Sequence, residues 1–138
     1  MAEYPIHGTL SDRSSVKPAK RTNHRQITMD YNFYFSQTGI KAGTPEQSAA
    51  DSAQVTATYD DMFDATSNGN RAPLILGNHF NSWNNNAYSD AMGKFVLDKC
   101  GRPDVKCVPF RDLVAWMDMQ DPARLHQLQQ QAPELPVQ

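Results

Sequence analysis

The sequence predicts an α/β fold in which about three parallel strands alternate with flanking helices. Apolar or β-branched runs lie near residues 27–30, 73–76 and 105–110, and apolar residues at helical spacing follow each run. The order strand, helix, strand, helix, strand, helix is typical of a parallel sheet or of part of a (β/α) barrel. Because a narrow parallel sheet leaves its edges exposed, we expect a larger assembly or an oligomer.

Composition narrows the class of protein. The 138 residues are enough for one domain with a core, and 39% of them are hydrophobic. The formal net charge of −2 argues against a nucleic-acid partner, which requires clustered Lys and Arg. No apolar run is long enough for a membrane span, and the residues after Met1 do not resemble a signal peptide.

Three segments are expected along the chain. Residues 1–25 contain Pro, Gly and Ser with little periodicity and are interpreted as an N-terminal loop segment. The basic cluster at residues 17–25 is interpreted as part of that solvated loop. Residues 26–121 hold the predicted α/β domain. Residues 122–138 are rich in Gln and Pro and are expected to form a frayed tail.

The first strand is predicted from Ile27 to Asp30, running into an aromatic loop or a short helix. The next element is a helix that ends near Ala65. Thr44 followed by Pro45 is a typical helix start, because the hydroxyl caps free N–H groups and proline fits the first turn.

The second strand is predicted over Pro73–Leu76 and is followed by an amphipathic helix over residues 87–100. A short strand over Val105–Phe110 comes next, and a last helix continues to Met119. The side chains of that helix expected to face inward are Leu113, Val114, Trp116 and Met117.

The second strand ends in a polar cluster that contains His79 and Trp83. An imidazole exchanges a proton near neutral pH, and an indole offers a flat apolar face that suits a sugar ring. A strand end of this kind is where α/β enzymes present functional side chains. The alternative is a histidine satisfied by its neighbours, without a function.

Cys100 and Cys107 are the two cysteines of the chain. Their spacing is too long for a CxxC zinc or redox pair, and no further cysteine could complete such a site. Gly101 and Pro103 between them favour a turn that brings the sulfurs together. A disulfide is therefore expected, and two reduced, half-buried thiols are the alternative.

Several stretches in this order resemble the C-terminal half of polysaccharide deacetylases, the family of chitin and peptidoglycan deacetylases with a nodulation-type catalytic domain. The resemblance covers about residues 26–119. The stretches are Met29–Tyr34, Asn70–Phe80 with Trp83, Tyr88–Cys100, Pro103–Phe110 and Leu113–Asp118. It implies part of a distorted (β/α) barrel and a hydrolase that removes acetyl groups from sugars, acting on C–N bonds other than peptide bonds.

The resemblance also implies a divalent metal, usually zinc, held by an aspartate and two histidines on N-terminal strands. This chain has no Asp-Asp pair at a strand end and no His-x-x-x-His pair. Asp60 and Asp61 are adjacent acids, but they lie within a predicted helix with no histidine pair after them. We therefore expect this chain alone to bind no metal.

The remaining family roles fall on the later half of the site. The resemblance makes His79 the proton donor to the leaving amine, and Asp30 the acid that orients it. An alternative for Asp30 is an acid that caps the turn after it. The expected substrate contacts are Leu76, Trp83 and Tyr31, although Gly77 and Asn78 stand between Leu76 and the histidine.

Two functions follow as hypotheses. The first is the C-terminal portion of a metal-dependent carbohydrate deacetylase, acting on an acetylated polysaccharide together with a missing N-terminal half or a second copy. The second is a saccharide-binding remnant without catalysis. For the parent protein, the family implies an extracellular or cell-envelope location.

Overall fold

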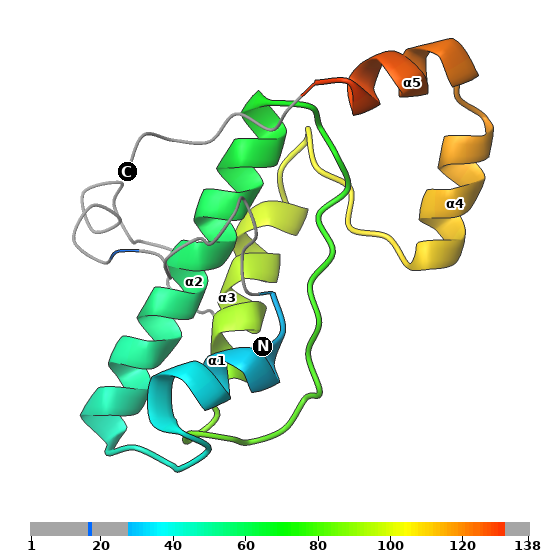
Figure 1. Cartoon of the computed structure of the whole chain (residues 1–138). Helices are drawn as coiled ribbons and strands as arrows, with labels where there is room; N and C mark the ends of the chain where they lie inside the picture. The colour runs from blue at the N-terminus through cyan, green and yellow to red at the C-terminus, as the bar shows by residue number, and fades with distance from the viewer. Residues whose placement is uncertain (1–16, 18–27, 132–138) are drawn as a thin grey trace.

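The structure is a computed structural model that describes Lys17 and residues 28–131. The predicted loop segment 1–25, apart from Lys17, the start of the first predicted strand at Ile27, and residues 132–138 of the predicted tail lie outside the described residues. The described part contains five helices. They are α1 (Asp30–Thr38), α2 (Pro45–Asn68), α3 (Ala87–Cys100), α4 (Phe110–Asp118) and α5 (Pro122–Gln129), shown in Figure 1.

The prediction of an α/β fold with about three parallel strands, as part of a (β/α) barrel, is wrong. The described residues form a small helical domain with no sheet, and their only β feature is an isolated parallel bridge between Met29 and Gly77. Residues 73–76 and 105–109 are extended but form no ladder. A strand exists only where a partner accepts its hydrogen bonds, and an apolar run does not specify that partner.

The helix boundaries follow local signals, as the sequence predicts. Thr44 caps α2, because its hydroxyl accepts the backbone N–H of Gln47, and Pro45 occupies the first position of the helix. Residues 87–100 form α3 as expected. The short-helix interpretation of the aromatic stretch is correct for α1, which ends at Gly39 in the left-handed conformation (φ 62°).

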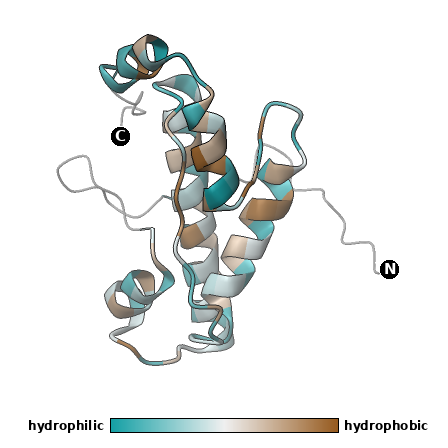
Figure 2. Cartoon of the chain, turned by 90° about the vertical axis from the view of Figure 1, so that its right-hand side faces the viewer, coloured by the Kyte–Doolittle hydropathy of each residue, from teal (hydrophilic) through white to brown (hydrophobic). Residues whose placement is uncertain are grey.

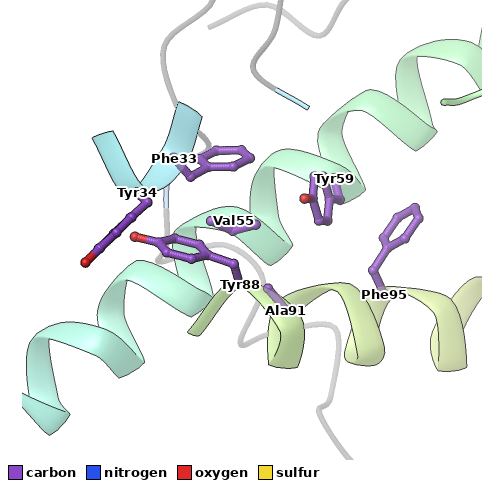
Figure 3. Close-up of a cluster of buried hydrophobic side chains, with 7 residues drawn as sticks. All are labelled: Phe33, Tyr34, Val55, Tyr59, Tyr88, Ala91 and Phe95. Atoms are coloured by element: carbon purple, nitrogen blue, oxygen red, sulfur yellow. The ribbon is translucent and has the colours of Figure 1, made fainter. Parts of the chain in front are cut away.

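The core lies among α1, α2 and α3 (Figure 3). Edge-to-face ring contacts connect the three helices, since Tyr59 on α2 lies 5.9 Å from Phe33 on α1 and 5.5 Å from Phe95 on α3. The buried cluster consists of Phe33, Tyr34, Val55, Tyr59, Tyr88, Ala91 and Phe95. Hydrophobic and hydrophilic residues alternate along the helices, as the colours of Figure 2 show.

Helices α4 and α5 differ from the other three because neither contains a buried residue. They stand to one side of the α1–α3 body in Figure 1. The expectation that α4 turns apolar side chains inward is wrong: Val114 is 54% exposed and Trp116 51% exposed. Leu113 and Met117 are only partly buried. Helical spacing predicts an apolar face but not the element that covers it.

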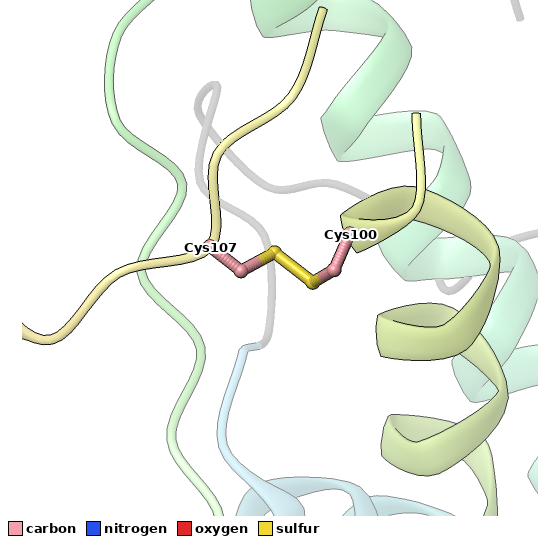
Figure 4. The surroundings of a disulfide bond; sticks show 2 residues. All are labelled: Cys100 and Cys107. Carbon is pink, nitrogen blue, oxygen red and sulfur yellow. A yellow bond between two sulfur atoms is a disulfide. The ribbon is translucent and has the colours of Figure 1, made fainter. Parts of the chain in front are cut away.

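The predicted disulfide between Cys100 and Cys107 is present (Figure 4). Its two Cα atoms are 5.5 Å apart, within the range that a disulfide spans. The bridge ties the C-terminal end of α3 to the extended residues that precede α4. It therefore adds a second covalent link, besides the backbone, between the end of α3 and the segment that leads to α4 and α5.

Candidate active site

The isolated bridge brings together the two segments that carry the candidate residues. The Asp30 backbone N–H donates to the Gly77 carbonyl at 3.2 Å, and the Gly77 N–H donates to the Thr28 carbonyl at 3.3 Å. The two segments run parallel at this point. Asp30 and His79, one and two residues beyond the paired positions, therefore emerge at the same end of the bridge.

Asp30 is the first residue of α1, and its side chain is 1% exposed. Its Oδ1 accepts the Tyr31 backbone N–H (2.7 Å) and lies 2.6 Å from Nδ1 of His79. Its Oδ2 accepts the His79 backbone N–H at 2.7 Å. Each oxygen of this buried carboxylate therefore has at least one N–H partner. The alternative of a residue that only caps the local turn accounts for just one of these three contacts.

His79 contacts this buried carboxylate with one side of its ring and solvent with the other. Its side chain is 52% exposed, and its Nδ1 donates to Asp30 because a carboxylate only accepts. Within the described residues its Nε2 makes no hydrogen bond. The carboxylate thus selects the tautomer with hydrogen on Nδ1 and leaves Nε2 open to exchange a proton with a ligand.

The imidazole contacts an aromatic cluster through one ring, that of Trp83. The His79 and Trp83 rings lie 5.4 Å apart, and Trp83 stacks on Tyr34 at 5.5 Å with an interplanar angle of 10°. Tyr31 meets the indole edge-on at 5.6 Å and is 40% exposed. The structure therefore places Tyr31, His79 and Trp83 in one cluster, although they come from separate parts of the sequence.

Leu76, the fifth candidate, lies in a different environment. It packs against the core and helps to line an apolar groove beside the start of α4. The groove is lined by Leu74, Ile75, Leu76, Val108, Phe110 and Leu113. Nothing in the described structure places its side chain against the imidazole, so its role as a substrate contact remains a prediction.

Tyr59 on α2 is buried within electrostatic range of Asp30 and stays protonated. Burial raises the pKa of Tyr59, and the negative charge of Asp30 raises that pKa further. The phenol O–H of Tyr59 donates to the Thr28 carbonyl over a long 3.5 Å. The neutral phenol thus supports the segment that leads into Asp30.

A buried asparagine that sequence reasoning missed fixes the position of Trp83. Asn84 is 1% exposed, and its Oδ1 accepts the Gly43 N–H and the Ser48 hydroxyl, each at 2.9 Å. Its Nδ2 donates to Asp51 at 2.7 Å and to the Tyr88 hydroxyl at 3.3 Å. These four bonds anchor the residue next to Trp83 to α2 and α3.

The signal for this anchor is present in the sequence as three consecutive asparagines. Asn84, Asn85 and Asn86 all have positive φ, between 51° and 69°. Asparagine tolerates this left-handed region better than other residues with a side chain. The triplet is therefore a left-handed turn that reverses the chain between His79 and α3.

The other acidic and histidine candidates lie elsewhere. Asp60 is in α2, and one of its oxygens lies 2.7 Å from Nζ of the buried Lys99. His126 is in α5, while His7 and His24 lie outside the described residues. Across residues 28–131 and Lys17, no group of three or more His, Cys, Asp or Glu side chains could hold a metal ion.

No protein-family model, curated protein or solved structure matches this chain. None of the described helices is both long and apolar enough to cross a membrane. The candidate function therefore rests on the residues and on the geometry given above.

Proposed function

We propose that this chain supplies the proton donor and the sugar-contacting side chains of a carbohydrate deacetylase. The observation that carries the proposal is the contact between buried Asp30 and half-exposed His79. Nδ1 of His79 lies 2.6 Å from Oδ1 of Asp30. The resemblance noted in the sequence gives His79 the role of proton donor and Asp30 the role of the acid that orients it. Acetylated polysaccharides or oligosaccharides are the proposed substrates.

His79 would act in the step that breaks the C–N bond. When the tetrahedral adduct of the acetyl group collapses, the electron pair of that bond moves to nitrogen, which needs a proton to leave as an amine. The protonated imidazole carries one N–H toward Asp30 and one at Nε2. His79 donates the Nε2 proton to the nitrogen, becomes neutral, and regains a proton from solvent. Asp30 stabilises the cationic form and fixes the ring orientation.

The family implies a divalent metal, but the described residues do not fit one. Both Asp30 oxygens already accept N–H groups, and no third ligand lies with Asp30 and His79. In the proposal, the metal ligands and the base that activates water belong to another segment or another polypeptide. His79 and Asp30 would then contribute only proton transfer to the complete site.

A second candidate function is saccharide binding without catalysis. It is favoured by the Tyr31, Trp83 and His79 cluster, which offers aromatic surface with no metal ligands beside it among the described residues. The two candidates differ in what they require of Asp30. Proton donation requires it to control the histidine tautomer, whereas binding alone does not.

The first test measures the histidine tautomer in the purified chain by nitrogen-15 NMR. Neutral His79 is expected to carry its hydrogen on Nδ1, and His126 in α5 serves as the internal control because no carboxylate is bonded to it in the structure. In Asp30→Asn, the His79 signal is expected to shift toward the pattern of His126. A wild-type His79 that already matches His126 would contradict proton donation controlled by Asp30.

The second test measures acetate release from acetylated chito-oligosaccharides. The purified chain is expected to release none, with or without zinc, because the described residues supply no metal ligand set. In an enzyme completed by a metal-binding partner, His79→Ala is expected to lower the rate constant by about a hundredfold or more. The thermal midpoint should change little, since the imidazole is half exposed. A nearly normal rate with a much lower midpoint would mean that His79 is structural.

A further inference from the structure

Phe80, directly after His79, is held in a conformation that packing does not explain. Its side chain is 85% exposed, and its backbone has a positive φ of 53°. Its N–H donates to Oδ1 of Asn78 at 2.6 Å, which fixes this conformation. A bulky residue in the left-handed region is strained, and such strain is concentrated at functional sites. The structure thus holds an exposed phenyl ring on the residue that directly follows the candidate proton donor in the chain.

The next two residues add unused polar groups. Asn81 and Ser82 are exposed, and neither side chain makes a hydrogen bond within the described residues. Their backbone carbonyls are used, since Asn81 accepts the Ser89 hydroxyl and Ser82 accepts the Asn86 N–H. The segment is therefore held in place through its backbone while an amide and a hydroxyl remain available to a ligand.

The charge pattern indicates which class of ligand fits. Between Arg71 and Asp90 the chain contains no Asp, Glu, Lys or Arg, although 20% of the whole chain is charged. The only side chain of this segment that can carry a positive charge is His79, and its imidazole is paired with Asp30. A phosphate or an acidic peptide therefore finds no unpaired cation in the segment, and a basic ligand finds no exposed acid. An aromatic face with a neutral amide and a neutral hydroxyl instead fits an uncharged sugar ring, which has apolar C–H faces and hydroxyl edges.

We propose that Phe80, Asn81 and Ser82 form a subsite for a neutral pyranose ring next to His79. The Phe80 ring stacks on the C–H face of the sugar, the Asn81 amide pairs with its acetamido group, and the Ser82 hydroxyl bonds a ring hydroxyl. The subsite deepens the proposed function by naming where the chain of sugars is held. It depends on that function only for the identity of the sugar, because the contacts themselves need no catalysis.

The experiment titrates the full-length chain with three hexamers and follows backbone amide shifts by NMR. The ligands are the hexamers of N-acetylglucosamine, of glucose, and of glucosamine, which is cationic. Phe80→Ala is expected to weaken binding of the N-acetylglucosamine hexamer about tenfold or more, because the aromatic contact is lost. Phe110→Ala is the matched control, since Phe110 is also an exposed phenylalanine (65%) but lines the groove beside α4. The Phe110→Ala variant should bind the N-acetylglucosamine hexamer as tightly as the wild type does.

Asn81→Ala is expected to abolish the preference for the N-acetylglucosamine hexamer over the glucose hexamer. The glucosamine hexamer should bind more weakly than both, because no acid lies in the segment. Equal losses in Phe80→Ala and Phe110→Ala, or no binding of any hexamer by the wild type, would overturn the subsite. If binding depends on Phe80 but His79 has the tautomer of His126, the subsite is supported and proton donation controlled by Asp30 is contradicted.

Discussion

Helices α2 and α4 contain apolar residues at helical spacing, yet only α2 buries them. Val55 and Tyr59 on α2 are fully buried against α1 and α3, whereas Val114 and Trp116 on α4 are about half exposed. The difference lies in the neighbours. Helix α2 packs extensively along α3, and α4 has no comparable partner in the described residues. Amphipathic spacing therefore predicted both helices, but spacing alone does not show which of them another element covers.

The stability of the described chain should accordingly come from the α1–α3 body. A buried aromatic side chain contributes the apolar area that it removes from water and the contacts that fill its volume. A half-exposed side chain on α4 contributes little of either. Three variants, which act at different places in the chain, test this comparison.

The largest effect is expected for Phe33→Ala. Phe33 is fully buried on α1, and its ring meets Tyr59 at 5.9 Å. The cavity left by the ring should lower the free energy of unfolding by about 3–5 kcal/mol. Urea denaturation followed by circular dichroism measures the change. The neighbouring but exposed Phe35→Ala is the control and should cost less than about 0.5 kcal/mol. Equal losses in both variants would contradict the assignment of the core to the α1–α3 body.

An intermediate effect is expected when the disulfide is removed in Cys100→Ser, Cys107→Ser. The closed loop is short, and loop-closure entropy gives a loss of about 2–3 kcal/mol in the free energy of unfolding. This holds only if the loop folds together with the body. The Arg102 guanidinium, which lies 5.2 Å from the Phe63 ring centre on α2, indicates that it does.

The measurement compares oxidised wild type, reduced wild type and the double variant by thermal unfolding. The reduced wild type and the double variant should have the same lowered midpoint. A midpoint that equals that of the oxidised protein would mean that the loop belongs with α4 and α5, and the boundary between the two regions would move to the end of α3.

The sequence predicted elements correctly where the signal lies within one turn. It predicted them wrongly where an element forms only against a distant partner segment. The cap at Thr44 and the proline at Pro45 are contained within one turn, so α2 could be located from the sequence. The strands at 73–76 and 105–110 could not be decided this way, because a ladder depends on a distant segment. A single bridge, between Met29 and Gly77, is what the described structure retains of the expected parallel pairing.

The structure brings Asp30 and His79 into contact beside the single bridge of the described residues. The roles of proton donor and orienting acid that the resemblance gives these two residues stay predictions. Sequence reasoning missed Asn84, although three consecutive asparagines pointed to a left-handed turn. Three of the four bonds that hold Asn84 come from Gly43, Ser48 and Asp51, which are 33 to 41 residues away in the chain, so local sequence does not show them.

The smallest effect is expected for Trp116→Ala on α4, and it tests the comparison most sharply. Truncation of a buried tryptophan costs about 3–5 kcal/mol, but Trp116 is 51% exposed and α4 has no buried residue. The free energy of unfolding should therefore change by less than about 0.5 kcal/mol. Fluorescence adds a second readout, because Trp83 then becomes the sole tryptophan and reports on the His79 cluster. Its emission should respond to N-acetylglucosamine hexamer in Trp116→Ala as in the wild type. A loss of several kcal/mol would show that α4 is covered in solution by a surface that its exposed face does not reveal.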